Sequence, residues 1–324
     1  MSIGYQEIAT AIILLAFGGI FIATIWLQLS KSFIAEIIGS FPLHLFFGLT
    51  SVATVLFIFA RAIGVNDNMF WLIMAFALLP VCFIVVRVLA FSFIHPKETR
   101  TEHSNLNIGS FNKQIGTENA HLIVDYAQQI GLDILGISEV KRIDFAKLLT
   151  GEYPYTFNSN KKYGIGQAEF LILSKYKLGE VKSISLDKFG NGVRTEVNIK
   201  GKRVAVYLIH TTAPISPELF LKRNEGFAKL TEILKAEKTK RIIVMGDLNI
   251  TPYSWEYRHS LGSLRHLIYN ATKGWGIHFT WAFFQPLSTQ LDHIFASKNI
   301  HTKQFIVDKN LKSDHNLIWA KLKV

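Results

Sequence analysis

Three long apolar stretches without any Asp, Glu, Lys or Arg limit what the first part of this 324-residue chain can fold into. They cover residues 8–30, 37–60 and 68–86. A helix needs about 20 apolar residues to cross roughly 30 Å of hydrocarbon. Each stretch is long enough, so the sequence predicts three transmembrane helices at about 8–30, 41–63 and 68–94.

Other interpretations of these stretches are open. A cleaved signal peptide would explain only the first stretch, which lacks a basic leading region and exceeds the usual apolar core of a signal. A buried helical hairpin of a soluble protein is the alternative for the other two. Aromatic residues near the predicted span ends favour a membrane anchor, because aromatic belts form there: Trp26, Phe41, Phe70 and Trp71.

Charge separates the two parts of the chain. The 35 Lys and Arg residues against 24 Asp and Glu residues leave a net charge of +11. Residues 1–95 hold three basic and three acidic side chains, so the whole excess belongs to residues 96–324. Such a domain suits anionic lipid headgroups, phosphorylated substrates or nucleic acid, although a lysine-rich solvated surface explains the charge equally well. The loops on the two sides of the predicted spans carry nearly equal numbers of Lys and Arg. These residues therefore do not determine the orientation of the spans in the membrane.

The single cysteine, Cys82, lies in the third predicted span. A disulfide framework and a cysteine-based metal site are therefore both excluded. After the predicted membrane anchor (residues 1–95) comes a polar linker at 96–104, and short strands and helices follow from residue 105 to 324.

Strands and helices alternate irregularly in this second part. Helices are predicted at Thr117–Ile130, with Thr117 as N-cap, and at Ser216–Ala236, where Pro217 suits the first turn. Many strands with few helices indicate an α/β fold of two sheets packed face to face with helices outside. The predicted strands are Leu106–Phe111, Leu132–Ser138, Tyr153–Phe157, Glu169–Ser174, Val193–Lys200, Arg203–His210, Arg241–Gly246, Gln290–Ala296, Thr302–Val307 and Asn316–Leu322.

Polar residues stand at or near the ends of these strands. They are Asn112, Glu139, His210, Asp247, Asn249, Asp292, Asp314 and His315. Side chains placed where core strands emerge are held by a rigid scaffold while facing solvent, as a catalytic cluster requires. Taken singly, each has an ordinary explanation; Asp247 and Asn249, for example, could form an Asx-turn.

The order of these residues is more specific than any one of them. "SFN", a glutamate after an apolar strand, "LIHT", "GDLN", "LDHIF" and a terminal "SDH" together resemble the endonuclease/exonuclease/phosphatase superfamily over residues 104–324. The resemblance implies a four-layer α/β sandwich with the site at one edge of the paired sheets. Many members have Gln before the metal-binding glutamate, where this chain has Ser138.

The resemblance also implies roles. Glu139 would be the main metal ligand, with Asn112 and either Asp314 or Asp247 completing the shell. Asp247 and Asn249 would position the attacking water, and His210 would contact phosphoryl oxygens. His315, hydrogen-bonded to Asp292, would be a general base or a phosphate-contacting acid. Carboxylate and amide oxygens without thiolates suit a hard cation, so Mg²⁺ is expected, with Mn²⁺ as a substitute.

The predicted membrane anchor limits the classes of phosphate substrate that are expected. Apolar spans followed by "GDLNITPYSWEYRHSL" and a later "TW" resemble a bacterial membrane-bound subgroup that includes teicoplanin-resistance membrane proteins. This favours a lipid-linked phosphate, such as a prenyl pyrophosphate or a phospholipid headgroup, with Ser254, Trp255 and Trp281 as substrate-binding residues. An apolar rim for lipid chains is expected from Trp255, Trp275, Trp281, Phe283 and Phe284.

Two alternatives belong to other functional classes. A membrane-tethered nuclease would use the same aromatic residues with Arg258, Arg265 and Lys273 to bind DNA or RNA. A catalytically silent membrane-binding module is disfavoured because every expected catalytic position is filled. The expected setting is the bacterial cytoplasmic membrane with an extracytoplasmic catalytic domain, and the bilayer and a lipid phosphate are the expected partners. No protein partner is implied.

Overall fold

The computed structural model describes residues 5–65, 67–94, 103–141, 144–149, 152–159, 169–188, 190–284 and 286–324. The chain divides into two compact units. One comprises Met1–Phe91 with Tyr253–Trp255, and the other comprises Ser92–Pro252 with Glu256–Val324. The predicted linker at 96–104 lies outside the described residues except for 103 and 104.

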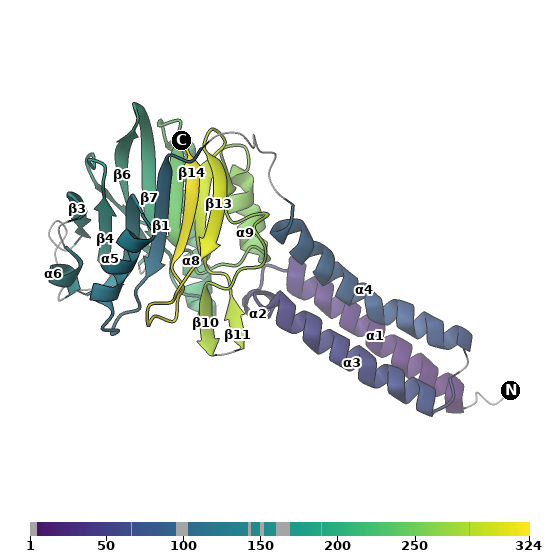
Figure 1. Ribbon diagram of the computed structural model, residues 1–324. Helices are drawn as coiled ribbons and strands as arrows, with labels where there is room; N and C mark the ends of the chain where they lie inside the picture. The colour runs from purple at the N-terminus through teal and green to yellow at the C-terminus, as the bar shows by residue number, and fades with distance from the viewer. Residues whose placement is uncertain are drawn as a thin grey trace. The chain divides into compact units, whose positions relative to one another are not determined.

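The first unit contains three long apolar helices: α1 (Tyr5–Leu29), α3 (Pro42–Ala62) and α4 (Asp67–Ser92) (Figure 1). Each is long and apolar enough to cross a membrane. Large apolar side chains on all three are exposed, including Leu15, Phe47 and Trp71. Water-soluble surfaces rarely expose so much apolar area, so these helices fit the predicted membrane anchor. The short α2 (Phe33–Gly39) was not predicted; it begins after Ser32, whose hydroxyl caps it.

The second unit contains two six-stranded mixed sheets (Figure 1). In spatial order the first is β13 (His301–Val307), β14 (Ile318–Lys323), β1 (Leu106–Asn112), β2 (Ile134–Val140), β4 (Glu169–Ser174) and β3 (Tyr155–Asn158). The second is β5 (Lys182–Ser185), β6 (Asn191–Ile199), β7 (Lys202–His210), β8 (Ile242–Asp247), β12 (Asp292–Ser297) and β9 (Ile268–Asn270). A separate hairpin consists of β10 (Trp281–Phe284) and β11 (Leu287–Thr289).

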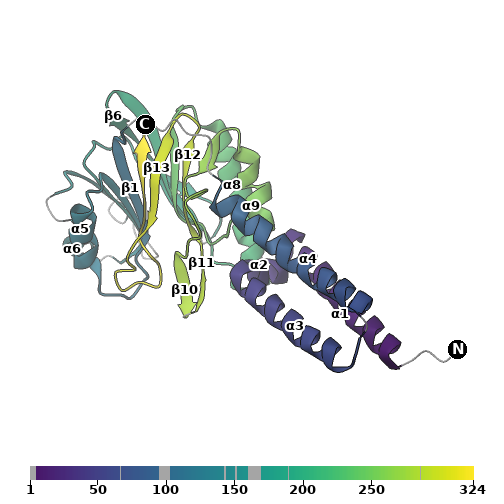
Figure 2. The same cartoon turned by 45° about the vertical axis from the view of Figure 1, so that its right-hand side comes forward.

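Alternation along the buried strands packs the two sheets into four layers. On β7, Val206 and Leu208 join the core between the sheets, whereas Tyr207 and Ile209 join the core on the outer face of the second sheet. That outer face is covered by α8 (Pro217–Ala236), and the outer face of the first sheet is covered by α5 (Ala120–Gln129) (Figure 2). The predicted four-layer α/β sandwich is therefore confirmed.

Some local predictions need correction. Thr117 is not an N-cap: α5 begins at Ala120 after Asn119, and the Thr117 hydroxyl donates instead to the carbonyls of Lys113 and Gln114. By contrast, Ser216 caps α8 and Pro217 begins it, as predicted. Strands β5, β9, β10 and β11 were missed because three or four residues are too few to show a period-two pattern. The short helices α6 (Phe145–Leu148), α9 (Trp255–His259) and η2 (Leu261–Leu264) were missed because four or five residues are too few to show the 3.6-residue period of a helix.

A hydrogen-bonded ion network on the second sheet predicts how stability depends on pH. The Glu237 carboxylate accepts hydrogen bonds from Arg194 and Tyr207. Burial raises the pKa of Glu237, but these hydrogen bonds outweigh burial and lower it from 4.5 to about 2. Because the folded pKa lies below the unfolded value, the contribution is complete above pH 4.5 and is lost as pH falls toward 2. The contribution of Glu237 to the free energy of unfolding that is lost over this pH interval is about 3 kcal/mol.

Urea unfolding of the detergent-purified protein at about pH 6 and about pH 3 measures this effect. We expect Glu237→Gln to lower the free energy of unfolding at the higher pH. The decrease in this free energy from the higher to the lower pH should be smaller in the variant than in the wild type. An unchanged decline in this variant would show that other groups cause the acid sensitivity.

Candidate active site

Strand register brings the predicted polar residues to one edge of the sandwich. The parallel pair β1 and β2 sets Asn112 opposite Ser138, the residue before Glu139. The parallel pair β7 and β8 sets His210 opposite Asp247. Antiparallel β12 then sets Asp292 opposite the same Asp247. Parallel neighbours end at the same edge of a sheet, so residues far apart in the sequence converge there.

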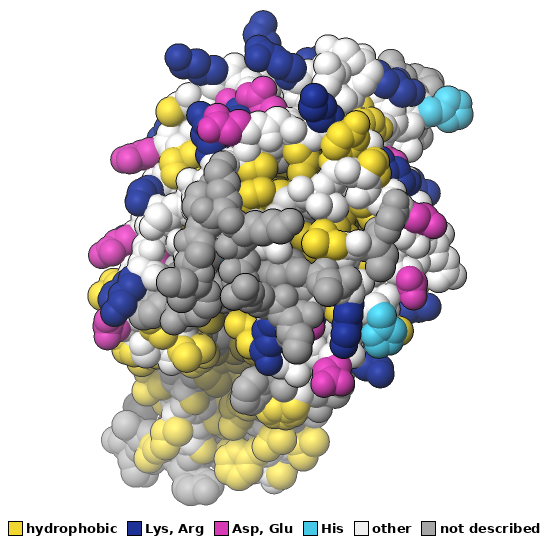
Figure 3. All heavy atoms as spheres, turned by 90° about the vertical axis from the view of Figure 1, so that its left-hand side faces the viewer, with side chains coloured by type: hydrophobic (Ala, Val, Ile, Leu, Met, Phe, Trp, Pro, Cys, Tyr) yellow, Lys and Arg dark blue, Asp and Glu magenta, His cyan; other side chains and the backbone are white. Residues whose placement is uncertain are grey.

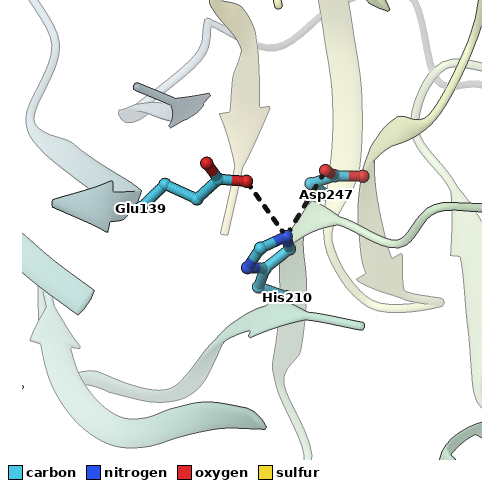
Figure 4. A group of neighbouring side chains, drawn as sticks. All are labelled: Glu139, His210 and Asp247. Carbon is cyan, nitrogen blue, oxygen red and sulfur yellow. Dashed lines mark ion pairs between the residues drawn. The ribbon is translucent and has the colours of Figure 1, made fainter. Parts of the chain in front are cut away.

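Glu139, His210 and Asp247 form the first part of the site (Figure 4). His210 Nε2 lies 3.5 Å from Glu139 Oε1 and 3.6 Å from Asp247 Oδ2. The Asn112 amide donates to both carboxylates, at 2.8 Å to Glu139 and 3.0 Å to Asp247. Asn112 thus ties the two sheets together across the site, and in this arrangement its amide nitrogen, not its oxygen, faces the carboxylates.

The backbone is strained where these side chains leave their strands. Glu139 has φ 58° and lies where the pairing of β2 with β4 shifts register. Asn249 has φ 47°, and its N–H donates to Asp247 Oδ1 at 2.9 Å. Gly246 has φ 140°, and an added Cβ there would clash with the Ile209 carbonyl oxygen. Left-handed conformations at non-glycine residues cost energy and are concentrated at functional sites.

The Asp247–Asn249 hydrogen bond shows that the Asx-turn explanation of this sequence is right in itself. It does not exclude the catalytic explanation. The turn is what points the Asp247 carboxylate, 2% exposed, toward His210.

Asp292 and His315 form the second part of the site. His315 Nδ1 lies 2.8 Å from Asp292 Oδ2, and His315 Nε2 lies 3.6 Å from Asp247 Oδ2. Burial lowers the pKa of His315, but the charges of Asp292 and Asp247 and the hydrogen bond outweigh burial and raise it to about 10. Burial also raises the pKa of Asp292. Since Asp292 holds Nδ1, the Nε2 atom of His315 is the one that can exchange a proton with a substrate.

Asp314 is oriented by Trp281. The Trp281 indole donates to Asp314 Oδ2 at 3.1 Å, and its strand pairs with the chain at His315. Among the described residues, Asp314 lies outside both clusters of convergent metal-ligand atoms. Its assignment as a metal ligand and that of Trp281 as a substrate contact stay predictions.

The residues at this edge fit a divalent cation. Ligand atoms of Glu139, His210 and Asp247 all lie within 4.8 Å of one another, as do those of Asp247, Asp292 and His315. Two carboxylates that share one amide donor repel each other, and a cation between them would remove that repulsion. Hard oxygen donors predominate around Glu139 and Asp247, as Mg²⁺ or Mn²⁺ requires.

Several residues of the predicted substrate region do not join this cluster. Ser254 directly precedes α9 and Trp255 begins it, and both group with the helical unit. Trp275 is only partly exposed and packs against the core between the sheets. The side chain of Phe283 lies outside the described set. The apolar rim predicted from three tryptophans and two phenylalanines is therefore not supported at Trp275.

Sequence reasoning assigned no role to two hydroxyl side chains that support the site. Thr280 Oγ1 accepts hydrogen bonds from the N–H groups of Leu291 and Asp292, both at 2.9 Å. Ser313 Oγ donates to the Asn112 carbonyl at 2.8 Å and accepts from the His315 N–H at 3.0 Å. The contact between Ser313 and the His315 N–H is local, but the contacts of Thr280 with Leu291 and Asp292 and of Ser313 with Asn112 join separate segments, so no local pattern indicates them.

Comparison with known proteins agrees with this geometry. Similar solved structures include humanized D. rerio TDP2, at 18% identity and a TM-score of 0.59, covering 68% of this chain and 99% of that chain. The mannosyl-6-phosphatase of Bacteroides thetaiotaomicron has 15% identity and a TM-score of 0.55, covering 68% and 100%. The human Nocturnin catalytic domain with bound sulfate has 18% identity and a TM-score of 0.54, covering 67% and 94%. At these identities the likeness shows the fold alone.

No curated protein sequence matches the chain. A family model described as "Endonuclease/Exonuclease/phosphatase family" matches residues 105–315, which is more than half of the chain and spans every catalytic residue predicted above. The chain therefore belongs to the endonuclease/exonuclease/phosphatase family, whose members are divalent-metal-dependent hydrolases of phosphate esters.

Proposed function

We propose that this protein is a membrane-anchored, Mg²⁺-dependent phosphohydrolase that cleaves a phosphate ester or pyrophosphate on a lipid-linked substrate. A prenyl pyrophosphate or a phospholipid headgroup is the substrate class. The observation that carries the proposal is the convergence of Glu139, His210, Asp247 and the Asp292–His315 pair at one sandwich edge. The chain joins this site to three helices that are apolar and long enough to span a bilayer.

In this proposal Glu139 and Asp247 would hold the cation, and Asn112 and Asp314 would complete its surroundings. The bound ion would neutralise charge on the phosphoryl oxygens. Asp247 and Asn249 would orient the attacking water. His210 would contact a phosphoryl oxygen. His315 would exchange a proton at Nε2 while Asp292 holds Nδ1.

Exposed apolar side chains around the site support a lipid-linked substrate. Ile115 is 49% exposed, and its N–H donates to Glu139 Oε2 at 3.0 Å. Ile215, 80% exposed, follows the strand that ends at His210. Phe279 and Phe284 are 39% and 54% exposed and belong to the segment carrying the β10–β11 hairpin, which projects beyond the sheets (Figures 1 and 2). These four residues, of which only Phe284 belongs to the rim expected from the sequence, are termed the apolar rim from here on and would meet lipid chains.

A membrane-tethered nuclease is the second candidate, and the net charge of +11 favours it. A structure of D. rerio TDP2, similar in fold at 17% identity, contains a single-strand DNA product. Among the described residues on the face shown in Figure 3, however, Lys and Arg are interspersed with Asp and Glu. On this face, that mixture of charges is typical of a solvated surface.

We further propose that the protein resides in the bacterial cytoplasmic membrane with its catalytic domain on the extracytoplasmic side. The resemblance to the membrane-bound subgroup supports this orientation. The test fuses after Val324 a reporter protein that is active only in the cytoplasm. Activity of this reporter would contradict the proposed orientation.

The test is a substrate panel with detergent-purified full-length protein: prenyl pyrophosphate and phospholipid in vesicles, a short-chain soluble analogue of each, and single- and double-stranded DNA. We expect Mg²⁺-dependent phosphate release from the lipids, lost with a chelator and restored by Mg²⁺ or Mn²⁺. Nuclease activity that depends on Asp247, without lipid hydrolysis, would contradict the proposal.

The same panel tests the apolar rim. The double variant Phe279→Ser, Phe284→Ser should hydrolyse vesicle-embedded substrate about 10-fold more slowly, because two large apolar contacts are lost. Hydrolysis of the soluble analogue should be unchanged. The matched control is Tyr155→Ser on β3, at the edge of the first sheet, with the same 39% exposure as Phe279. Equal losses on both forms of substrate would show that the rim does not act on the lipid.

A further inference from the structure

Three consecutive backbone carbonyls directly after Asp247 each accept a hydrogen bond from a side chain of a different element. The donors come from the segment after β7, from α8 and from β12. Thr211 Oγ1 donates to the Leu248 carbonyl, Arg223 Nη1 donates to the Asn249 carbonyl at 2.8 Å, and His293 Nε2 lies 2.8 Å from the Ile250 carbonyl. Carbonyls of a connecting segment ordinarily bond to water, so this arrangement is unusual for a turn.

All three donors are buried. Thr211 is 2% exposed, and Arg223 and His293 are 0% exposed. The His293 tautomer follows from its partners: a carbonyl only accepts, so Nε2 carries the proton, and Nδ1 accepts from the amides of Asn270 and Gln290. Burial lowers the pKa of His293 to about 4, which keeps this neutral tautomer at physiological pH.

Arg223 is the least expected of the three. A guanidinium is rarely buried completely, since its charge loses hydration. Here it lies over the rings of Phe220 and Phe227, with centroid distances of 5.3 and 5.7 Å. Its Nε and Nη2 donate to Asn224 Oδ1, which leaves Nη1 directed at the Asn249 carbonyl. The side chain therefore connects the helix layer to the turn beside the site.

The carbonyls matter because they fix the peptide planes of the turn. Asn249 has φ 47°, and its N–H donates to Asp247 Oδ1, so the orientation of Asp247 depends on this strained backbone. The Asn249 side-chain amide also donates to the Thr211 carbonyl at 2.9 Å. If the plane after Asn249 rotated, the N–H contact to Asp247 and the direction of its carboxylate would both change.

We propose that Thr211, Arg223 and His293 form a carbonyl clamp, a set of positioning residues that holds Asp247 and Asn249 in the geometry needed for hydrolysis. None of the three needs to contact the substrate. The inference requires only that Asp247 acts in the phosphate-ester hydrolysis typical of the family. It does not depend on a lipid substrate.

The test compares Arg223→Met with Arg194→Met in the full-length protein. Arg194 is a mostly buried arginine on β6 of the second sheet, but its partners are Glu196 and Glu237, away from the turn. Both variants should lower the unfolding midpoint. Only Arg223→Met should lower kcat on bis(p-nitrophenyl) phosphate with Mg²⁺, by about 10- to 100-fold with KM nearly unchanged, because catalytic groups are displaced rather than removed. Arg223→Lys, which keeps one donor, should restore part of kcat.

Amide hydrogen exchange of residues 245–252 gives an answer that needs no substrate. We expect Arg223→Met to accelerate exchange in this segment about 10-fold while the rest of the second sheet stays protected, since loss of the clamp opens the turn locally. If Arg223→Met disturbs folding, Thr211→Val removes a different clamp donor with a smaller change in shape. Unchanged exchange in 245–252 and unchanged kcat in the folded variants would show that the three side chains only stabilise the fold.

Discussion

Replacing Asp247 by asparagine is expected to lower turnover by about 10³-fold or more, while the protein remains folded. Asp247 has four polar side chains around its carboxylate: Asn112, Asn249, His210 and His315. The amide keeps the shape of the residue and an oxygen to accept the Asn249 N–H, so the Asx-turn is retained. The substitution removes the negative charge of the carboxylate, which two histidines face and which a bound cation would face.

The measurement is kcat on the substrate that the panel identifies, with folding monitored by circular dichroism. Asp133→Asn is a matched control, because Asp133 precedes β2 at the opposite end of that strand from the site and accepts the Asn107 N–H at 2.8 Å. We expect this control to affect stability only. Turnover close to wild type in Asp247→Asn would remove Asp247 from the catalytic residues.

The second large effect is expected at Asp292. Asp292→Asn should reduce kcat by up to about 10⁴-fold, the loss seen when an orienting aspartate beside a catalytic histidine becomes an amide. The carboxylate, fully buried, fixes the direction of the His315 ring through the contact at 2.8 Å. An amide in its place can present an N–H to Nδ1 and select the wrong tautomer.

This substitution has a spectroscopic signature. In the wild-type structure the charges of Asp292 and Asp247, against the effect of burial, raise the pKa of His315 to about 10. Removal of one negative charge should lower that pKa, which nuclear magnetic resonance of the imidazole carbons can follow. A His315 pKa and a kcat that both stay at their wild-type values would show that Asp292 does not control this histidine.

Much of the sandwich could be predicted because its strands are long and buried. The β7 sequence Lys202–His210 and the β8 sequence Ile242–Asp247 are apolar runs bounded by polar residues, and both were placed nearly at their observed limits. The capping of α8 by Ser216 is a local interaction, in which its hydroxyl accepts from the Leu219 N–H three residues further along the chain. The prediction of Thr117 as an N-cap was wrong, because its hydroxyl donates to competing local acceptors, the carbonyls of Lys113 and Gln114.

The candidate site was predictable at the level of residue type and order. The family motifs carry Asn112, Glu139, Asp247 and His315, and the structure brings all four to one edge. Their partners within that edge were less predictable. Arg223 shares one helical face with Phe220 and Phe227, at spacings of three and four residues, so an arginine on the buried face of α8 was a visible signal. What it bonds to could not be read from that spacing.

The sequence by itself predicted the three apolar spans, the separate basic second part and two packed sheets with helices outside, and the order of its motifs, through their resemblance to the family, predicted the candidate catalytic side chains. Each of these depends on composition, periodicity or local order along the chain. Only the tertiary structure decided that Asn112 bridges Glu139 and Asp247, and that three buried side chains contact the backbone carbonyls directly after Asp247. These contacts join segments that lie far apart in sequence, and the register of the strands and the packing of α8 create them.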